Sequence, residues 1–259
     1  SRMLDDDDSS AREIGDVVQT DPSITSRVLK MVNSAYYSLP HPVASISQAV
    51  SLLGNQRLKH ILIGTVMSGI FKDLHNSDFS MQEFWQHSIK TAIIARHLAM
   101  QNAHIVDHDA LFTAGLIHDI GKLVIESLNP GYMVDVERLK QAGGLGIAKA
   151  ETEVMGYAHT DVGGAMLQKW GLPEMLVQCV RNHHRVDHEG HYASAGCIVY
   201  LANRLSHHTP PQDEVEAEEL LCKIPNWQQT RCTVEQTCTA WQLAEDQVFE
   251  VMDSFGLSV

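Results

Sequence analysis

The sequence has no run of apolar residues that approaches the roughly 20 needed to cross a bilayer. Its first residues show no basic segment followed by an apolar one, the pattern of a secretory leader. Cysteine is scarce as well: the five cysteines are an odd number and include no Cys-x-x-Cys pair, so neither a disulfide framework nor a thiolate zinc site is predicted. These absences favour a cytoplasmic protein with no membrane association.

Positive charge is also in short supply. Lys and Arg number 19 against 32 Asp and Glu, which gives a formal net charge of −13. Because such a field repels a phosphate backbone, we expect no nucleic-acid partner. With 259 residues, of which 44 % are hydrophobic, the chain is long enough to bury a sizeable core in one large domain or two modest ones.

Sustained alternation of apolar and polar residues, the pattern of a half-buried strand, is absent too. Apolar residues instead recur at helical spacing along nearly the whole chain, and Gly and Pro separate the segments. This pattern predicts an all-α multi-helix bundle with helices at about 22–32, 46–53, 58–70, 81–100 and 107–127. Composition divides the chain into an N-terminal helical part (1–77), a histidine-rich core (78–206) and an acidic C-terminal helical extension (207–259).

Histidine is the residue that is unusually abundant, with fifteen in the chain. Five of them lie on apolar faces of predicted helices: His87, His118, His159, His183 and His184. His118 is followed directly by Asp119 inside the predicted helix 107–127. Neighbouring helical residues point about 100° apart, so both side chains can reach one point only if it lies between them. A divalent metal ion tolerates that geometry.

A different explanation exists for each histidine taken alone. A single inward histidine is more often a core residue bonded to a carbonyl than a metal ligand, and the pair His183-His184 also fits a solvated helix end. Five inward histidines without a common partner would leave many polar atoms stranded. We therefore predict one shared metal site, and we place histidines such as His207 and His208 on the surface.

Several motifs follow one another in a recognisable order. They are Asp21-Pro22-Ser23, Asn33-Ser34-Ala35, Phe84-Trp85-Gln86-His87-Ser88, Gly115 to Lys122, His159 with Val162-Gly163, and Trp170-Gly171-Leu172-Pro173-Glu174. The histidine order resembles the HD superfamily of metal-dependent phosphohydrolases, whose HD-GYP branch carries the string His-Asp-Ile-Gly-Lys. Over roughly residues 10–205 the chain looks like an HDOD domain, a bacterial signalling module.

The resemblance implies a set of metal ligands. A first metal would be held by His87, His118 and Asp119, and Asn203 stands where the superfamily has a distant Asp. In HD-GYP sites a second metal shares the HD aspartate with three histidines, which here implies Asp119, His159, His183 and His184. The Gly-Tyr-Pro element is missing after His184, so hydrolysis of a cyclic dinucleotide is not favoured.

Mixed imidazole and oxygen ligands suit a divalent transition metal, with Fe, Mn, Ni and Zn all open. Two such ions would set four positive charges against the single carboxylate of Asp119, which favours one ion, or two with a bridging hydroxide or phosphate. If the site is catalytic, Asp119 would help to activate a metal-bound water. Lys122 would stabilise developing negative charge, although it fits a solvent-facing lysine at a helix end equally well.

Three functions remain open from the sequence. The resemblance favours a bacterial HDOD regulatory module, not strongly catalytic, that engages a signalling protein or a small phosphorylated ligand. The alternative is a metal-dependent phosphohydrolase acting on a nucleotide-like phosphomonoester or phosphodiester, because most of the ligand set is kept. A purely structural helical scaffold with unrelated histidines is the least favoured.

Overall fold

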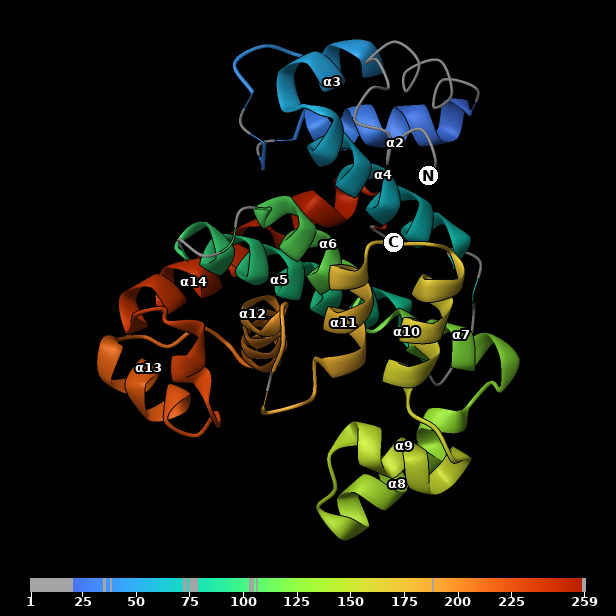
Figure 1. Cartoon of the computed structure of the whole chain (residues 1–259), viewed down its shortest axis with the longest axis vertical. Helices are drawn as coiled ribbons and strands as arrows, with labels where there is room; N and C mark the ends of the chain where they lie inside the picture. The colour runs from blue at the N-terminus through green and yellow to red at the C-terminus, as the bar shows by residue number, and fades with distance from the viewer. Residues whose placement is uncertain are drawn as a thin grey trace.

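A computed structural model of the chain describes residues 21–257 apart from 35, 38, 72–73, 75–78, 103–104, 106 and 188. The regular elements in this part are helices, which confirms the expected all-α fold (Figure 1). They are α2 (Pro22–Val32), α3 (Ile46–Leu53), α4 (Asn55–Ile70), α5 (Met81–Met100), α6 (His108–Ile117), α7 (Ile120–Leu128), α8 (Tyr132–Gly143), α9 (Ile147–Met155), α10 (His159–Lys169), α11 (Glu174–Asn182), α12 (Ala193–Leu205), α13 (Glu214–Leu221), the 3-10 helix η1 (Trp227–Thr230) and α14 (Val234–Ser254). The N-terminal residues of the motif-bearing region, up to residue 20, lie outside the described residues.

Local sequence signals set several helix ends where they were predicted. Asp21 caps α2, because its carboxylate accepts from the backbone N–H groups of Ser23 and Ile24 at 2.9 and 3.2 Å, and Pro22 opens the helix. Helix α5 spans the predicted 81–100, with Ser80 as its cap. Helix α3 ends at Gly54, whose φ of 84° lies in the region that glycine tolerates.

The centre of the bundle is α5, which packs against α6, α12 and α14. Its buried residues Trp85, Ile89 and Ile94 are at most 2 % exposed. Helix α14, from the C-terminal extension, contributes the buried Trp241 to the same core. Figure 1 shows α2 and α3 at one end of the molecule and α8 and α9 at the other. The main core therefore draws on all three parts that composition distinguished.

Helices α8 and α9 have a small apolar core of their own. It contains Ile125, Tyr132, Val136 and Ala150 and is separate from the main core. The α8–α9 lobe packs on α7 and α10, which are helices of the histidine-rich region. No helix in the described part of the chain is long and apolar enough to cross a membrane.

The predicted continuous helix over 107–127 is wrong in its middle. Helix α6 stops at Ile117 and α7 starts at Ile120, so His118 and Asp119 form the junction between them. The His118 ring donates from Nδ1 to the carbonyl oxygen of Gly115 at 2.7 Å. In an uninterrupted helix that carbonyl would accept from the backbone of residue 119. The His-Asp pair therefore lies at a bend rather than on the side of a regular helix.

Candidate metal centre

Four segments of the bundle bring the candidate ligands together. His87 comes from α5, His118 and Asp119 from the α6–α7 junction, and His159 is the first residue of α10. His183 and His184 directly follow α11. All six side chains belong to two groups that could each hold a metal ion. We call Asp119, His159, His183 and His184 the inner subsite, and His87, His118 and Asp119 the outer subsite.

Two glycines allow these segments to approach one another closely. A Cβ atom at Gly115 would lie 2.6 Å from Cα of Ala92 on α5, and one at Gly121 would lie 2.0 Å from the carbonyl oxygen of His159. Any side chain there would push α6 away from α5, or α7 away from α10. The glycines of the string from Gly115 to Lys122 thus fix the spacing that lets the histidines meet.

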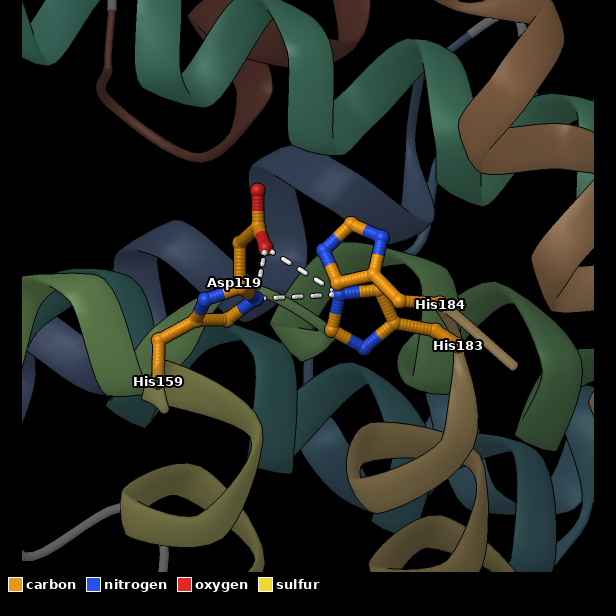
Figure 2. A group of neighbouring side chains, drawn as sticks. All are labelled: Asp119, His159, His183 and His184. Atoms are coloured by element: carbon orange, nitrogen blue, oxygen red, sulfur yellow. Dashed lines mark hydrogen bonds and ion pairs between the residues drawn. The ribbon is translucent and has the colours of Figure 1, made fainter. Parts of the chain in front are cut away.

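Three residues of the inner subsite, Asp119, His159 and His183, are buried, and His184 is half-buried. Nε2 of His159 and Nε2 of His183 lie 3.1 and 3.3 Å from Asp119 Oδ1, and 3.2 Å from each other. Figure 2 shows the rings of His159 and His183 turned toward the carboxylate of Asp119, with the ring of His184 beside them. Ligand atoms about 2.1 Å from one ion lie about 3.0–3.4 Å from one another in octahedral or tetrahedral geometry. The observed separations therefore fit a common ion.

The outer subsite uses the other oxygen of the same carboxylate. Nε2 of His118 lies 3.3 Å from Asp119 Oδ2, and Nε2 of His87 lies 3.6 Å from it. The two Nε2 atoms are 3.2 Å apart. Asp119 therefore belongs to both subsites, and its role as a shared metal ligand stays a prediction.

The far side of each ring determines which nitrogen carries the proton. His118 donates from Nδ1 to Gly115 O at 2.7 Å, and His183 donates from Nδ1 to Val180 O at 2.8 Å. In their neutral forms these rings have only a lone pair on Nε2. Such lone pairs aimed into one small space cannot hydrogen-bond to one another, but they can coordinate a cation. Anchoring of this kind is typical of metal-ligating histidines.

Several buried polar atoms around the centre make no hydrogen bond. They include Asp119 Oδ1, whose two close imidazole contacts lack hydrogen-bond geometry, and His184 Nε2. A third is Asn203 Oδ1 on α12. Buried polar atoms without a partner are costly, and a bound cation would satisfy them. The residues present therefore fit a divalent metal ion.

The electrostatics keep the ligands in the protonation states that metals bind. Burial lowers the pKa of His183 to about 3 and lowers the pKa values of His87 and His184 well below their usual range. Burial acts the other way on Asp119, but His118 and Lys122 nearby hold the pKa of its carboxyl well below its usual range. The centre thus presents the ionised carboxylate of Asp119 beside the neutral rings of His87, His183 and His184.

His159 differs from the other rings because its far side meets a carboxylate. Glu151 on α9, 0 % exposed, lies with Oε2 2.5 Å from His159 Nδ1 and 2.9 Å from the backbone N–H of His159. Burial lowers the pKa of His159, but the nearby carboxylates of Asp119 and Glu151 outweigh it and raise that pKa. Glu151 is not among the site residues predicted from the sequence. Its only sequence signal is its position four residues after Ile147 and four before Met155, on the apolar face of α9.

Lys122 lies at the edge of the centre, with Nζ 2.6 Å from Asp119 Oδ2. It also lines a cavity of about 500 Å³. The walls of this cavity include His87, Lys90, Asp119, Lys122, Ser206 and His207. The outer subsite therefore faces an accessible space, and of the inner subsite only Asp119 reaches that space.

Asn203 on α12 and His207 just after that helix were both assigned roles from the sequence. Asn203 lies on α12, and its carbonyl accepts from Ser206, whose hydroxyl is 3.0 Å from His87 Nδ1. Its role as a ligand stays a prediction. His207 is exposed, as predicted for a surface histidine, but its ring stacks on His87 with centroids 4.3 Å apart. No feature of the sequence indicated that contact.

One family model and several known proteins match this chain. The family model of the HDOD domain matches residues 1–186. An uncharacterised protein of Treponema pallidum (strain Nichols) is 25 % identical over 190 residues, a match that covers 72 % of this chain and 36 % of the relative. The chain thus spans about a third of the length of the curated relative that it matches.

Solved structures with the same fold include two that are named for different roles. One is a candidate phosphohydrolase from Shewanella amazonensis SB2B, with a TM-score of 0.80 and 21 % identity, covering 99 % of this chain and 91 % of that chain. The other is a candidate signal transduction protein from Marinobacter aquaeolei VT8, with a TM-score of 0.72 and 18 % identity, covering 99 % of this chain and 57 % of that chain. At these identities the likeness shows the fold alone.

Proposed function

This chain belongs to the HDOD domain family, and from that premise we propose that it is a bacterial regulatory module built around a divalent transition-metal centre. The inner and outer subsites together hold one or two ions. A small phosphorylated ligand enters the 500 Å³ cavity beside them, and its binding is passed on to a signalling protein partner.

The observation that supports this proposal is that the Nε2 atoms of different histidines converge on one small space. Nε2 atoms of His159 and His183 lie 3.2 Å apart, and those of His87 and His118 lie equally close at 3.2 Å. Histidines that served only packing would each point at a partner of their own. Here the far nitrogens are anchored and the near ones converge, which is the arrangement that a metal requires.

Lys122 and the cavity support the choice of a phosphorylated ligand. A metal ion bound at this centre would supply Lewis acidity toward a phosphoryl oxygen. Lys122 adds a cation at the cavity wall, 2.6 Å from Asp119 Oδ2, where its ammonium group can donate to a phosphate oxygen. His207, stacked on His87, lies on the same wall.

Regulation is preferred to catalysis for two reasons. Asn203, where the HD superfamily has an aspartate, removes one negative charge from the ligand set, and the Gly-Tyr-Pro element is missing. Both features weaken the case for efficient phosphodiester hydrolysis. The fold is shared with a protein named for signal transduction, which agrees with this preference.

Phosphohydrolase activity is the second candidate, and a specific observation favours it. Asp119 and Lys122 line the same cavity, so a phosphate there would meet the metal ligand and the cation together. Another protein with this fold is named as a candidate phosphohydrolase. In this case Asp119 would hold the metal and Lys122 would stabilise the charge that develops on the phosphoryl oxygens.

Metal analysis tests the centre directly. The protein is purified without an affinity-nickel column and without added metal, and its transition metals are quantified by elemental analysis. We expect one or two ions per chain, and a loss of metal in both His118→Ala and Asp119→Ala, because each removes a ligand. Protein that is folded but contains and takes up no transition metal would refute the proposed centre.

An activity assay separates the two candidates. The metal-loaded protein is incubated with bis-(p-nitrophenyl) phosphate and, separately, with p-nitrophenyl phosphate. We expect binding of inorganic phosphate, detected by calorimetry, without significant turnover. Turnover that disappears in both His118→Ala and Asp119→Ala would instead establish the phosphohydrolase.

A further inference from the structure

The two subsites differ in what supports their histidines from behind. Nδ1 of His118 and Nδ1 of His183 face backbone carbonyls, and Nδ1 of His87 faces the Ser206 hydroxyl. Nδ1 of His159 faces a carboxylate, that of Glu151. Of these four rings, only that of His159 has a carboxylate in contact with its Nδ1 atom. His159 belongs to the inner subsite.

This carboxylate is held rigidly and away from solvent. Glu151 and His159 are both 0 % exposed, and Oε2 of Glu151 also accepts from the backbone N–H of His159 at 2.9 Å. The two contacts fix the ring and the carboxylate relative to each other. In such a setting a negative charge strengthens the donor nitrogen and offsets the charge of a bound cation, with little screening.

The outer subsite has the opposite electrostatic environment. Its oxygen, Asp119 Oδ2, is the one that Lys122 contacts at 2.6 Å, whereas Oδ1 faces His159 and His183. A lysine cation there competes with a metal ion for the same oxygen and repels it. His87 and Lys122 also line the cavity, so solvent reaches this side.

We propose that Glu151, acting through His159, makes the inner subsite the tight one: it fills first and keeps its ion while the outer subsite exchanges. This inference rests on the proposed metal centre and adds the order of filling and the residue that sets it. Glu151 is a positioning residue, because it touches a ligand rather than the ion. A single resident ion would then lie with His159, His183 and His184, and the exchangeable position would face the cavity.

Zinc titration of the full chain tests the order. The protein is stripped with a chelator and then titrated with Zn²⁺ in competition with a chromophoric chelator, which gives a dissociation constant for each binding step. We expect a tight and a weak step. Glu151→Gln keeps the shape and removes the charge, and it should weaken the tight step about 10–100-fold while leaving the weak step unchanged.

A matched control is available in the same part of the fold. Glu126 is likewise buried, at 1 % exposed, but its Oε1 accepts from the backbone N–H of Gly131. Glu126→Gln should leave both zinc steps unchanged, and thermal unfolding of both variants in the presence of chelator reports whether each is folded. An equal weakening of the tight step in Glu126→Gln would show a general effect of removing a buried carboxylate from this part of the fold, and it would overturn the role of Glu151.

Two ligand variants assign the steps even if Glu151→Gln does not fold. His184→Ala should abolish the tight step, and His87→Ala should affect only the weak one. Loss of the tight step in His87→Ala would overturn the proposed order. A tight step that survives in folded Glu151→Gln would overturn only the role of Glu151. Absence of any zinc binding by the wild-type protein would refute the metal centre itself, a result distinct from the other two.

Discussion

Asp109 and Asp119 are two buried aspartates, 4 % and 2 % exposed, that lie ten positions apart in the chain and have opposite surroundings. Asp109 accepts from Arg96 Nε and Arg57 Nε, one at each oxygen, both at 2.9 Å. Arg96 also lies over the ring of Tyr36 at 5.0 Å. Both carboxylate oxygens of Asp109 are therefore paired with protein groups.

Asp119 is surrounded by groups that cannot satisfy one another. Its Oδ1 has no hydrogen bond, and His118 and His183 each turn an Nε2 lone pair toward the same space, because their Nδ1 atoms donate to backbone carbonyls. Both aspartates are buried and charged, so burial does not distinguish a structural cluster from a binding site. The difference lies in whether the buried acceptors are paired with donors of the protein or need a bound cation instead.

Metal binding should change the free energy of unfolding more than the other tests do. This change should depend on Asp119 and not on Asp109. Because the ion binds the folded protein alone, free metal at about 1,000 times its Kd should raise the free energy of unfolding by about 4 kcal/mol. Urea unfolding with Zn²⁺ and with chelator measures this difference. Asp119→Ala should abolish it, and a full metal effect in that variant would contradict the comparison.

Asp109→Ala should have the next largest effect on the free energy of unfolding, and this effect should not depend on metal. The change leaves Arg96, 18 % exposed, without its carboxylate, and loss of one partner from a buried pair costs about 3 kcal/mol. Urea unfolding in chelator measures this cost. Asp135→Ala is the matched control, because its pair with Arg138 is exposed and should matter little. Equal unfolding in the two variants would show that the Asp109 cluster is not stabilising.

Asn203→Asp should sharpen the contrast by adding a negative charge to the metal centre. We expect zinc to bind the weak step about tenfold more tightly, a change of about 1.4 kcal/mol, because a neutral amide ligand becomes a carboxylate. Zinc competition measures it. Asn182→Asp adds the same charge at a side chain that bonds Gln178 instead. Unchanged affinity in Asn203→Asp would mean that Asn203 is not a ligand.

Acid should expose the smallest difference. The pKa of His183 is lowered to about 3 in the folded protein, against about 6.5 when unfolded. Between these values the unfolded chain binds a proton that the folded protein does not, so stability falls as pH drops below 6.5. At pH 6 His183 alone should cost about 0.8 kcal/mol in metal-free protein. Urea unfolding at pH 7.5 and 6 should show a smaller loss in His183→Gln, but not in exposed His191→Gln.

The sequence predicted well wherever a local signal was enough. Asp21-Pro22 began α2, Gly54 ended α3, and the apolar spacing gave Met81–Met100 its full length. The prediction failed at His118 and Asp119, because the helical spacing of apolar residues continues across the junction between α6 and α7. A ring bond to Gly115 O interrupts the helix there, and apolar spacing carries no record of such a bond.

Residue types and their order were enough to indicate the fold class, the family likeness and the histidines worth examining. Only the tertiary structure decided that their ring nitrogens converge, that Glu151 stands behind His159, and that Lys122 faces the outer subsite. The reason is physical: helix periodicity depends on neighbours three or four positions away, whereas a metal centre depends on atoms from distant helices meeting within a few ångströms. That meeting is set by how the helices pack, down to glycines that leave no room for a side chain.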